Sequence, residues 1–132
     1  MADLPYKASE VSGYVTKQTV VNLQRWLKKV GYYAQGRSVD GSWGYWTTLG
    51  VQQYLRTKYL PGYPKTRCYA GALDGDFGTM TKSAMGDAVW YVIGARPGST
   101  MGGYCAGGSC TISWPHVEVV KCWQYFLNNN AK

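Results

Sequence analysis

Apolar residues recur every three or four positions in four stretches of the chain, and this spacing predicts four amphipathic helices. The expected helices span residues 16–30, 47–59, 80–93 and 115–128. In the first of them, Val20, Leu23 and Leu27 fall on a single stripe that would face a core. Gly31 is a residue type that commonly ends a helix, and Pro115 suits the first turn of the last helix. The pattern therefore predicts a mainly α fold, a compact bundle of about four helices joined by long turns.

A short motif occurs twice, before the second and before the third expected helix. The copies are Asp40-Gly41-Ser42-Trp43-Gly44-Tyr45-Trp46-Thr47 and Asp74-Gly75-Asp76-Phe77-Gly78-Thr79-Met80-Thr81, which share the pattern D-G-x-aromatic-G-x-x-T. Asp-Gly begins a tight turn in which glycine takes a positive φ. We expect the last threonine of each copy to cap the following helix. Trp43 and Phe77 are interpreted first as plugs of apolar gaps, with ligand contact as the alternative.

Three of the expected helices also share a glutamine. Gln24, Gln52 and Gln124 occupy one position in the aligned helices, where the third helix has Gly86. Because buried amides need partners, we expect these glutamines to hydrogen-bond loop backbone, with ligand contact as the minority alternative. The alignment predicts one domain over residues 1–132, with pseudo-repeats at about 16–59 and 60–130.

Composition points to binding surfaces without choosing a partner. The chain has 12 Tyr and 6 Trp against 2 Phe, and such rings suit half-exposed positions on sugar-binding or protein-binding faces as well as core margins. Its formal net charge of +7 fits solubility alone or a polyanionic partner. Nucleic acid, an anionic membrane surface and cell wall that bears teichoic acid all qualify.

Four cysteines favour an oxidising compartment. Cys105 and Cys110 bracket a glycine-rich loop that can bring their sulfur atoms together, and the preferred second pair is Cys68 with Cys122. Free buried thiols are the alternative. A zinc site is disfavoured because paired C-x2-C spacing is absent. The N-terminus lacks the apolar run of a signal peptide, so an extracellular role requires another export route or a larger parent protein.

The first motif and the helix before it resemble the peptidoglycan-binding domain family, small helical modules at the ends of bacterial and phage cell-wall hydrolases. The resemblance rests on Leu23-Gln24-x-x-Leu27, Gly31-Tyr32-Tyr33, Val39-Asp40-Gly41-x-Trp43-Gly44-x-x-Thr47 and Val51-x-x-Tyr54. It is strongest over residues 16–58 and continues more weakly through 74–94 and the last helix. The tandem layout is similar to the wall-binding repeats of phage endolysins. Gly50 and Leu55 depart from the Ala and Gln that the family usually has.

This resemblance implies a non-catalytic module that binds peptidoglycan outside the cell and directs an attached lytic enzyme to its substrate. The residues agree, because a zinc hydrolase needs two or three ligands and His116 is the single histidine. A glycosidase needs two facing carboxylates, and no acidic pair stands out. A pair of Cys122 and His116 would lie on opposite faces of one helix. We therefore expect no catalytic residue, metal or cofactor.

The expected binding face consists of the helix-entry loops and the tyrosine-rich linkers. Its candidate residues are Tyr32, Tyr33, Arg37, Asp40, Trp43, Tyr45, Trp46, Tyr63, Arg67, Tyr69, Asp74 and Phe77. Aromatic rings pack on sugar faces, and Arg37, Lys65 and Arg67 suit phosphate or carboxylate groups. Core or rim packing is the alternative for each aromatic residue.

A basic helical nucleic-acid-binding or protein-interaction domain is the rival interpretation. Arg25, Lys28 and Lys29 form a basic cluster on the first expected helix. Other basic residues are spread through loops, however, and no recognised DNA-binding pattern occurs. We therefore expect a monomer that binds neither nucleic acid nor membrane.

Overall fold

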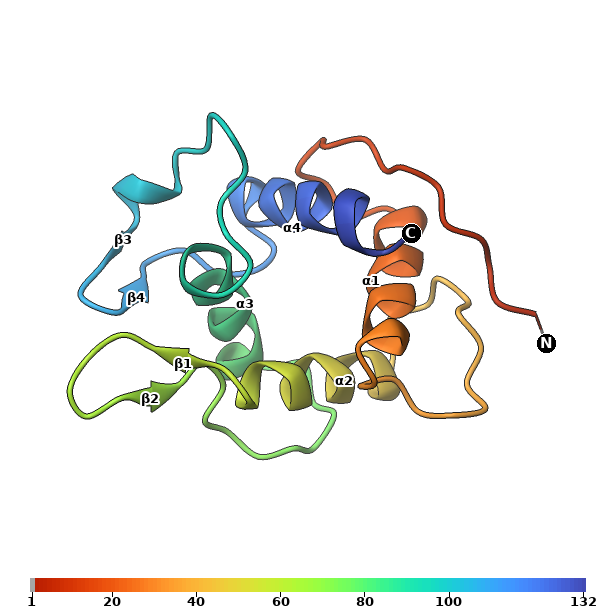
Figure 1. Cartoon of the computed structure of the whole chain (residues 1–132), viewed down its shortest axis with the longest axis horizontal. Helices are drawn as coiled ribbons and strands as arrows, with labels where there is room; N and C mark the ends of the chain where they lie inside the picture. The colour runs from red at the N-terminus through yellow and green to blue at the C-terminus, as the bar shows by residue number, and fades with distance from the viewer. Residues whose placement is uncertain (1) are drawn as a thin grey trace.

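The computed structural model describes residues 2–132, and its four helices form a closed circle (Figure 1). The helices are α1 (Lys17–Lys29), α2 (Tyr45–Arg56), α3 (Thr79–Tyr91) and α4 (Val117–Asn130). Each helix packs against the next one along the chain, and α4 packs against α1. The prediction of a mainly α fold with four helices is confirmed. We call this arrangement the helical circle.

Short elements fill the long connections between helices. A hairpin of β1 (Tyr59–Leu60) and β2 (Thr66–Arg67) follows α2. A second hairpin, β3 (Cys105–Ala106) with β4 (Ser109–Cys110), comes after the 3-10 turn η1 (Met101–Gly103) and precedes α4. Both hairpins lie outside the helical circle on the side of α3 (Figure 1). No helix within residues 2–132 has the length and apolar composition needed to span a bilayer.

The core lies inside the helical circle and is built from the same two positions of every helix. These pairs are Leu23 with Leu27, Val51 with Leu55, Met85 with Val89, and Trp123 with Leu127. All eight side chains are at most 1% exposed. Burying side chains of this size contributes about 1.5–3 kcal/mol each, so the apolar stripes read from the sequence account for the circular packing.

Glutamines of α1 and α2 connect each helix to the turn that begins the next. Gln24 Oε1 accepts hydrogen bonds from the amides of Asp40 and Gly41 at 3.1 and 2.9 Å, and its Nε2 donates to Thr47 Oγ1 at 3.0 Å. Gln52 makes the equivalent bonds to the Gly75 amide and to Thr81 Oγ1, both at 3.0 Å. The expectation that these glutamines bind loop backbone is confirmed.

Gln124 binds a third copy of the turn, which lies near the N-terminus. Its Oε1 accepts from the Gly13 amide at 3.0 Å, and its Nε2 donates to the Tyr14 carbonyl and to Thr19 Oγ1 at 2.9 and 3.1 Å. Gly13, Gly41 and Gly75 share a positive φ of 83°, 77° and 69°. Residues 12–19 therefore repeat the motif with Ser, Val and Thr in place of Asp, the aromatic residue and the second Gly.

The fourth joint of the circle, from α3 to α4, has lost both partners of this hydrogen bond. Gly86 replaces the glutamine, and Val119 replaces the threonine. A Cβ atom on Gly86 would lie 2.3 Å from the Ile112 carbonyl oxygen, so the backbone before α4 packs directly on α3. Backbone contact takes the place of the side-chain amide at this joint.

The helix starts differ from those expected. The N-cap residues of α2 and α3 are Gly44 and Gly78, so the expectation that Thr47 and Thr81 cap these helices is wrong. Both threonines lie in the first turn, where their hydroxyls accept hydrogen bonds from the glutamines. His116 caps α4 by accepting from the Glu118 amide at Nδ1, which places Pro115 before the helix.

The cysteines form one disulfide. Cys105 and Cys110 face each other across the β3–β4 hairpin and are bonded, as expected. The expected bond between Cys68 and Cys122 is wrong, because both thiols are free and buried. Cys68 Sγ lies 3.4 Å from the Ala84 carbonyl oxygen, whereas Cys122 Sγ lies 3.9 Å from Glu118 Oε1. Each sulfur atom thus has its own polar neighbour in the core.

Candidate functional site

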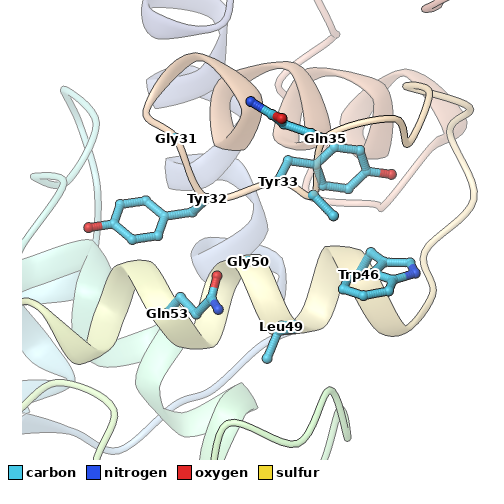
Figure 2. Close-up of a pocket in the computed structure, with 9 residues that line it drawn as sticks. Gly31, Tyr32, Tyr33, Gln35, Trp46, Leu49, Gly50 and Gln53 are labelled. Carbon is cyan, nitrogen blue, oxygen red and sulfur yellow. The ribbon is translucent and has the colours of Figure 1, made fainter.

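A groove runs along the outer side of α2, between this helix and the loop that follows α1 (Figure 2). Figure 2 shows Tyr32 and Tyr33 on the loop side, opposite Trp46 and Gln53 on the helix. The groove is lined by Gly31, Tyr32, Tyr33, Ala34, Gln35, Trp46, Leu49, Gly50 and Gln53. We call it the α2 groove. It brings together three of the aromatic residues that the sequence proposed as ligand contacts.

Gly50 allows the loop to approach α2 this closely. A Cβ atom at this position would lie 2.3 Å from the Tyr32 carbonyl oxygen and 3.1 Å from Leu27 Cδ1. Real Cβ atoms do not approach a backbone oxygen to that distance, so an alanine would push the loop away. Gly50 therefore shapes the groove.

A hollow lined by one cationic and one acidic side chain, Arg37 and Asp40, adjoins one end of the α2 groove. Beyond Tyr33 and Trp46 the surface continues into a hollow that Arg37, Asp40 and Tyr45 also line. The Arg37 guanidinium lies 5.0 Å from the centroid of the Trp46 ring, and the Tyr45 ring meets Trp46 edge-on at 5.0 Å. Arg37 is exposed and forms no salt bridge among residues 2–132. Its charge is available to an acidic ligand.

The opposite end of the α2 groove passes Tyr32 and Gln53 and reaches Arg56 and Arg67. Arg67 donates to the Arg56 carbonyl at 2.6 Å and lies over the Tyr59 ring at 5.2 Å. Together with these two extensions, the groove follows α2 from Trp46 to Arg56, a rise of about 15 Å at 1.5 Å per residue. An extended polymer therefore fits this surface better than a compact small molecule.

Asp40 and Asp74 shape their turns. Asp40 Oδ1 accepts from the Ser42 amide at 2.9 Å and from Gln24 at 3.2 Å. Asp74 makes the same two contacts, with the Asp76 amide and Gln52, and these bonds lower its pKa below the usual value. Among these two, Asp40 alone borders the hollow beside the α2 groove.

Two of the tyrosines proposed from the sequence lie apart from the α2 groove. Tyr63 is fully exposed in the connection between β1 and β2. Tyr69 is only 4% exposed, so the expectation that its ring is available to a ligand is wrong. Its backbone amide donates to the Leu55 carbonyl at the end of α2, and its hydroxyl donates to the Ala72 carbonyl at 2.6 Å. These bonds hold the Tyr69 ring in the core.

Trp43 and Phe77 meet on a different surface. Their ring centroids are 4.6 Å apart, and Trp114 lies 5.5 Å from Trp43. They line an open cup of about 490 Å³ together with Val15, Gly44, Thr48, Gly75, Trp114 and Pro115. Both rings are half-buried and pack against the core, as the motif predicted, while one side of each borders the cup. We call this hollow the axial cup.

Two titratable side chains outside the two hollows, His116 and Asp87, have structural partners. His116 uses Nδ1 as a helix cap, and the Asp87 carboxylate accepts from the Cys110 amide at 2.7 Å. Burial raises the pKa of Asp87 above its usual value despite that hydrogen bond. Within residues 2–132, no three His, Cys, Asp or Glu side chains form a group suited to a metal ion. The α2 groove and the adjoining hollow supply aromatic faces, side-chain amides and a guanidinium, which are binding groups.

The sequence interpretation missed Gln53 and Leu49 in the α2 groove. Both stand on the outer face of α2, beside residues that point into the core. Neither residue is aromatic or basic, which are the residue types expected to contact a wall polymer. The pattern of polar positions on α2 marked Gln53 as outward-facing, which is the signal that was available.

Comparison with known proteins adds no relative. No family model matches the chain, and neither a curated protein nor a solved structure shows significant similarity to it.

Proposed function

We propose that the chain is a non-catalytic, monomeric module that binds bacterial peptidoglycan and directs an attached lytic enzyme to the cell wall. The proposal draws on the resemblance of residues 16–58 to peptidoglycan-binding domains and on the α2 groove. The observation that carries it is the arrangement of Tyr33, Tyr45 and Trp46 beside the unpaired Arg37.

The chemistry of the groove suits a wall polymer. Sugar rings present C–H faces that pack on aromatic rings, and the polar edges of Tyr33 and Trp46 are suited to hydroxyl and acetamido groups. The Gln53 amide is both a donor and an acceptor. Arg37 provides paired donors for a carboxylate or phosphate group. Peptidoglycan and its attached polymers carry all of these groups along an extended chain.

An extracellular site of action is part of this proposal. The Cys105–Cys110 disulfide is compatible with an oxidising environment, where such bonds persist. The bacterial wall after cell lysis or secretion is such an environment.

The proposal is tested by co-sedimentation of the purified protein with bacterial sacculi. Trp46→Ala and Tyr45→Ala are each expected to weaken binding about fivefold, since removing one ring loses about 1 kcal/mol, the apolar transfer energy of about 40 Å² of ring face at about 25 cal/mol per Å². Trp90→Ala and Tyr125→Ala are the matched controls, because these rings are 43% and 41% exposed and lie outside the α2 groove. Unchanged binding by both groove variants, with an intact fold by circular dichroism, would refute the assignment of the groove.

Two further arms separate the possible partners. Sacculi stripped of teichoic acid are compared with untreated sacculi, and duplex DNA is added as a competing ligand. Binding to stripped sacculi supports peptidoglycan itself as the ligand. Preference for DNA over sacculi would replace the proposed function with nucleic-acid binding. Salt dependence does not discriminate, because both interactions weaken as salt rises.

A further inference from the structure

The axial cup collects one residue from each of the four joints of the helical circle. Val15, Trp43, Phe77 and Pro115 each stand directly before the N-cap residue of a helix, and all four line the cup. They come from segments as far apart as positions 15 and 115. The approximate fourfold repetition of the fold thus gathers equivalent positions at one place, in the way that a repeat protein builds a shared binding surface.

The interior of the axial cup is aromatic and apolar. The indole N–H of Trp43 donates to Thr48 Oγ1 at 2.8 Å, so this polar edge is satisfied within the protein. The rings of Trp43 and Phe77 are tilted by 35° to each other and remain half-buried. What the cup offers is ring surface, which packs on apolar faces of a ligand.

The two helices that begin directly after these rings lack a side-chain cap. Gly44 and Gly78 cap α2 and α3 without any side-chain hydrogen bond, whereas the side chains of Thr16 and His116 cap α1 and α4. The amides in the first turn of a helix need such a cap, water or a ligand. The two joints that carry the aromatic rings are therefore the two whose helix starts lack a side-chain cap.

The axial cup and the α2 groove are neighbours. Gly44 lines both the cup and the hollow that contains Arg37. Between them lies Tyr45, whose ring packs on the backbone of Gly75, where a Cβ atom would be 2.3 Å from Tyr45 Cδ2. The 52% exposed Tyr45 therefore bridges the two surfaces. One extended ligand is able to contact the groove, Tyr45 and the cup in turn.

We infer that the axial cup is a second sugar subsite, which takes the C–H face and acetamido methyl group of one N-acetylated hexose in a glycan strand. The inference rests on the proposed function and narrows it, because it makes the glycan the ligand that is recognised, in place of the stem peptide or teichoic acid. An aromatic floor that is followed in the chain by two helix starts without a side-chain cap matches a sugar, which is apolar on its faces and polar around its edges. A purely apolar occupant would pack on the rings and would form no hydrogen bond with the backbone amides of these helix starts.

The test uses a defined probe, the hexamer of β-1,4-linked N-acetylglucosamine, titrated into the isotope-labelled protein. Indole N–H signals in NMR spectra report on each tryptophan without any change to the fold. Saturable shifts are expected for Trp43 in the cup and Trp46 in the groove. Trp123, which is 1% exposed in the core, serves as the internal control. Shifts confined to Trp46 would overturn the inference.

A matched pair of variants gives the second measurement. Val15→Asp places a carboxylate at the wall of the cup, where desolvation of the charge is expected to lower hexamer affinity about tenfold. Val30→Asp is the control, since Val30 and Val15 are 38% and 41% exposed and Val30 is not in the cup. Equal hexamer affinities of Val15→Asp and the wild type would also overturn the inference. If the wild-type protein binds sacculi but not the hexamer, the glycan subsite is refuted and the proposed function stands. If the wild-type protein does not bind sacculi at all, the proposed function itself is refuted.

Discussion

The side chain of Gln124 donates a hydrogen bond to Thr19 Oγ1 at 3.1 Å, across a sequence separation of 105 residues. The same bond joins Gln24 to Thr47 and Gln52 to Thr81 between consecutive helices. Gln124 thus contacts residues 12–19 in the same way as Gln24 and Gln52 contact the motif that follows each of them. The last helix and residues 12–19 close the helical circle, so hydrogen bonds join the two ends of the chain.

Replacing Gln124 by Ala is expected to destabilise the protein by about 2–3 kcal/mol, because the buried Gly13 amide and the part-buried Tyr14 carbonyl lose their partner. Urea denaturation followed by circular dichroism measures this change. Gln52→Ala should lower the stability by a similar amount, since the Gly75 amide loses its hydrogen-bond acceptor. Gln53→Ala is the matched control in the adjacent position, where the side chain lines the α2 groove. A stability of Gln124→Ala equal to that of Gln53→Ala would mean that closure by residues 12–19 contributes nothing.

Gly50→Ala tests whether the α2 groove depends on close backbone approach. The new methyl group would meet the Tyr32 carbonyl oxygen at 2.3 Å, and overpacking of this kind costs about 1–3 kcal/mol. We expect a lower melting temperature and, at temperatures where the variant is folded, weaker sacculus binding because Tyr32 and Tyr33 move away from α2. Gly103→Ala is the control, as a Cβ there has no neighbour within 4 Å. Equal melting temperatures and equal sacculus binding of the Gly50→Ala and Gly103→Ala variants would show that the α2 groove does not depend on Gly50.

The sequence predicts those parts of the fold that depend on residues within a single helix. The stripe of Val20, Leu23 and Leu27 predicts the buried face of α1 without reference to any other segment. The shared glutamines likewise predicted contacts with loop backbone. In both cases the prediction rests on a property of a single helix: the period of its apolar residues or a buried glutamine.

Features that depend on contacts between distant segments escaped prediction. The third copy of the turn retains Gly13 and Thr19, but Ser12 and Val15 replace the Asp and the aromatic residue, and only contact with Gln124 identifies it. The α2 groove was not predicted because it depends on the position of the Tyr32 backbone, whereas sequence patterns describe side chains. Residues 12–19 are therefore a repeat by structure and only weakly one by sequence.

The joint between α3 and α4 shows a related limit. Gly86 interrupted the glutamine pattern and indicated a break in the repeat. In the structure this glycine admits the Ile112 carbonyl, and Val119 fills the place of the missing threonine. The two replacements belong to one joint, and pairing them requires knowledge of which helix follows which in space.

Glu118→Gln should lower stability at neutral pH by about 1–2 kcal/mol, because Glu118 Oε2 accepts from Arg96 at 3.1 Å and its side chain is only 8% exposed. Burial alone would raise the pKa of Glu118, but hydrogen bonds from Ser99 and Arg96 outweigh it and lower that pKa. A lowered pKa in the folded state means that the ionised carboxylate stabilises the fold above the unfolded pKa. This contribution is lost as the pH falls through the folded pKa.

The stability difference between wild type and Glu118→Gln should therefore shrink at acidic pH, where the wild-type carboxyl group is protonated and resembles the amide. Urea titrations from about pH 7 down to about pH 3 span the ordinary carboxyl range and measure the trend. Glu10→Gln controls for removal of a charge, because Glu10 is exposed and makes no salt bridge within residues 2–132. A difference that is constant with pH would show that the ion pair does not stabilise the fold.

Thiol reactivity provides a direct check on the cysteine assignment. Burial raises the pKa of Cys68 to about 12, so almost no thiolate is present at pH 8, and Cys122 is 0% exposed. Ellman's reagent is expected to react slowly with the native protein. In guanidinium chloride without reductant, both Cys68 and Cys122 should react, while Cys105 and Cys110 remain bonded. A denatured protein without reactive thiols would mean that Cys68 and Cys122 are oxidised, since unfolding exposes any free thiol whatever its surroundings in the native core.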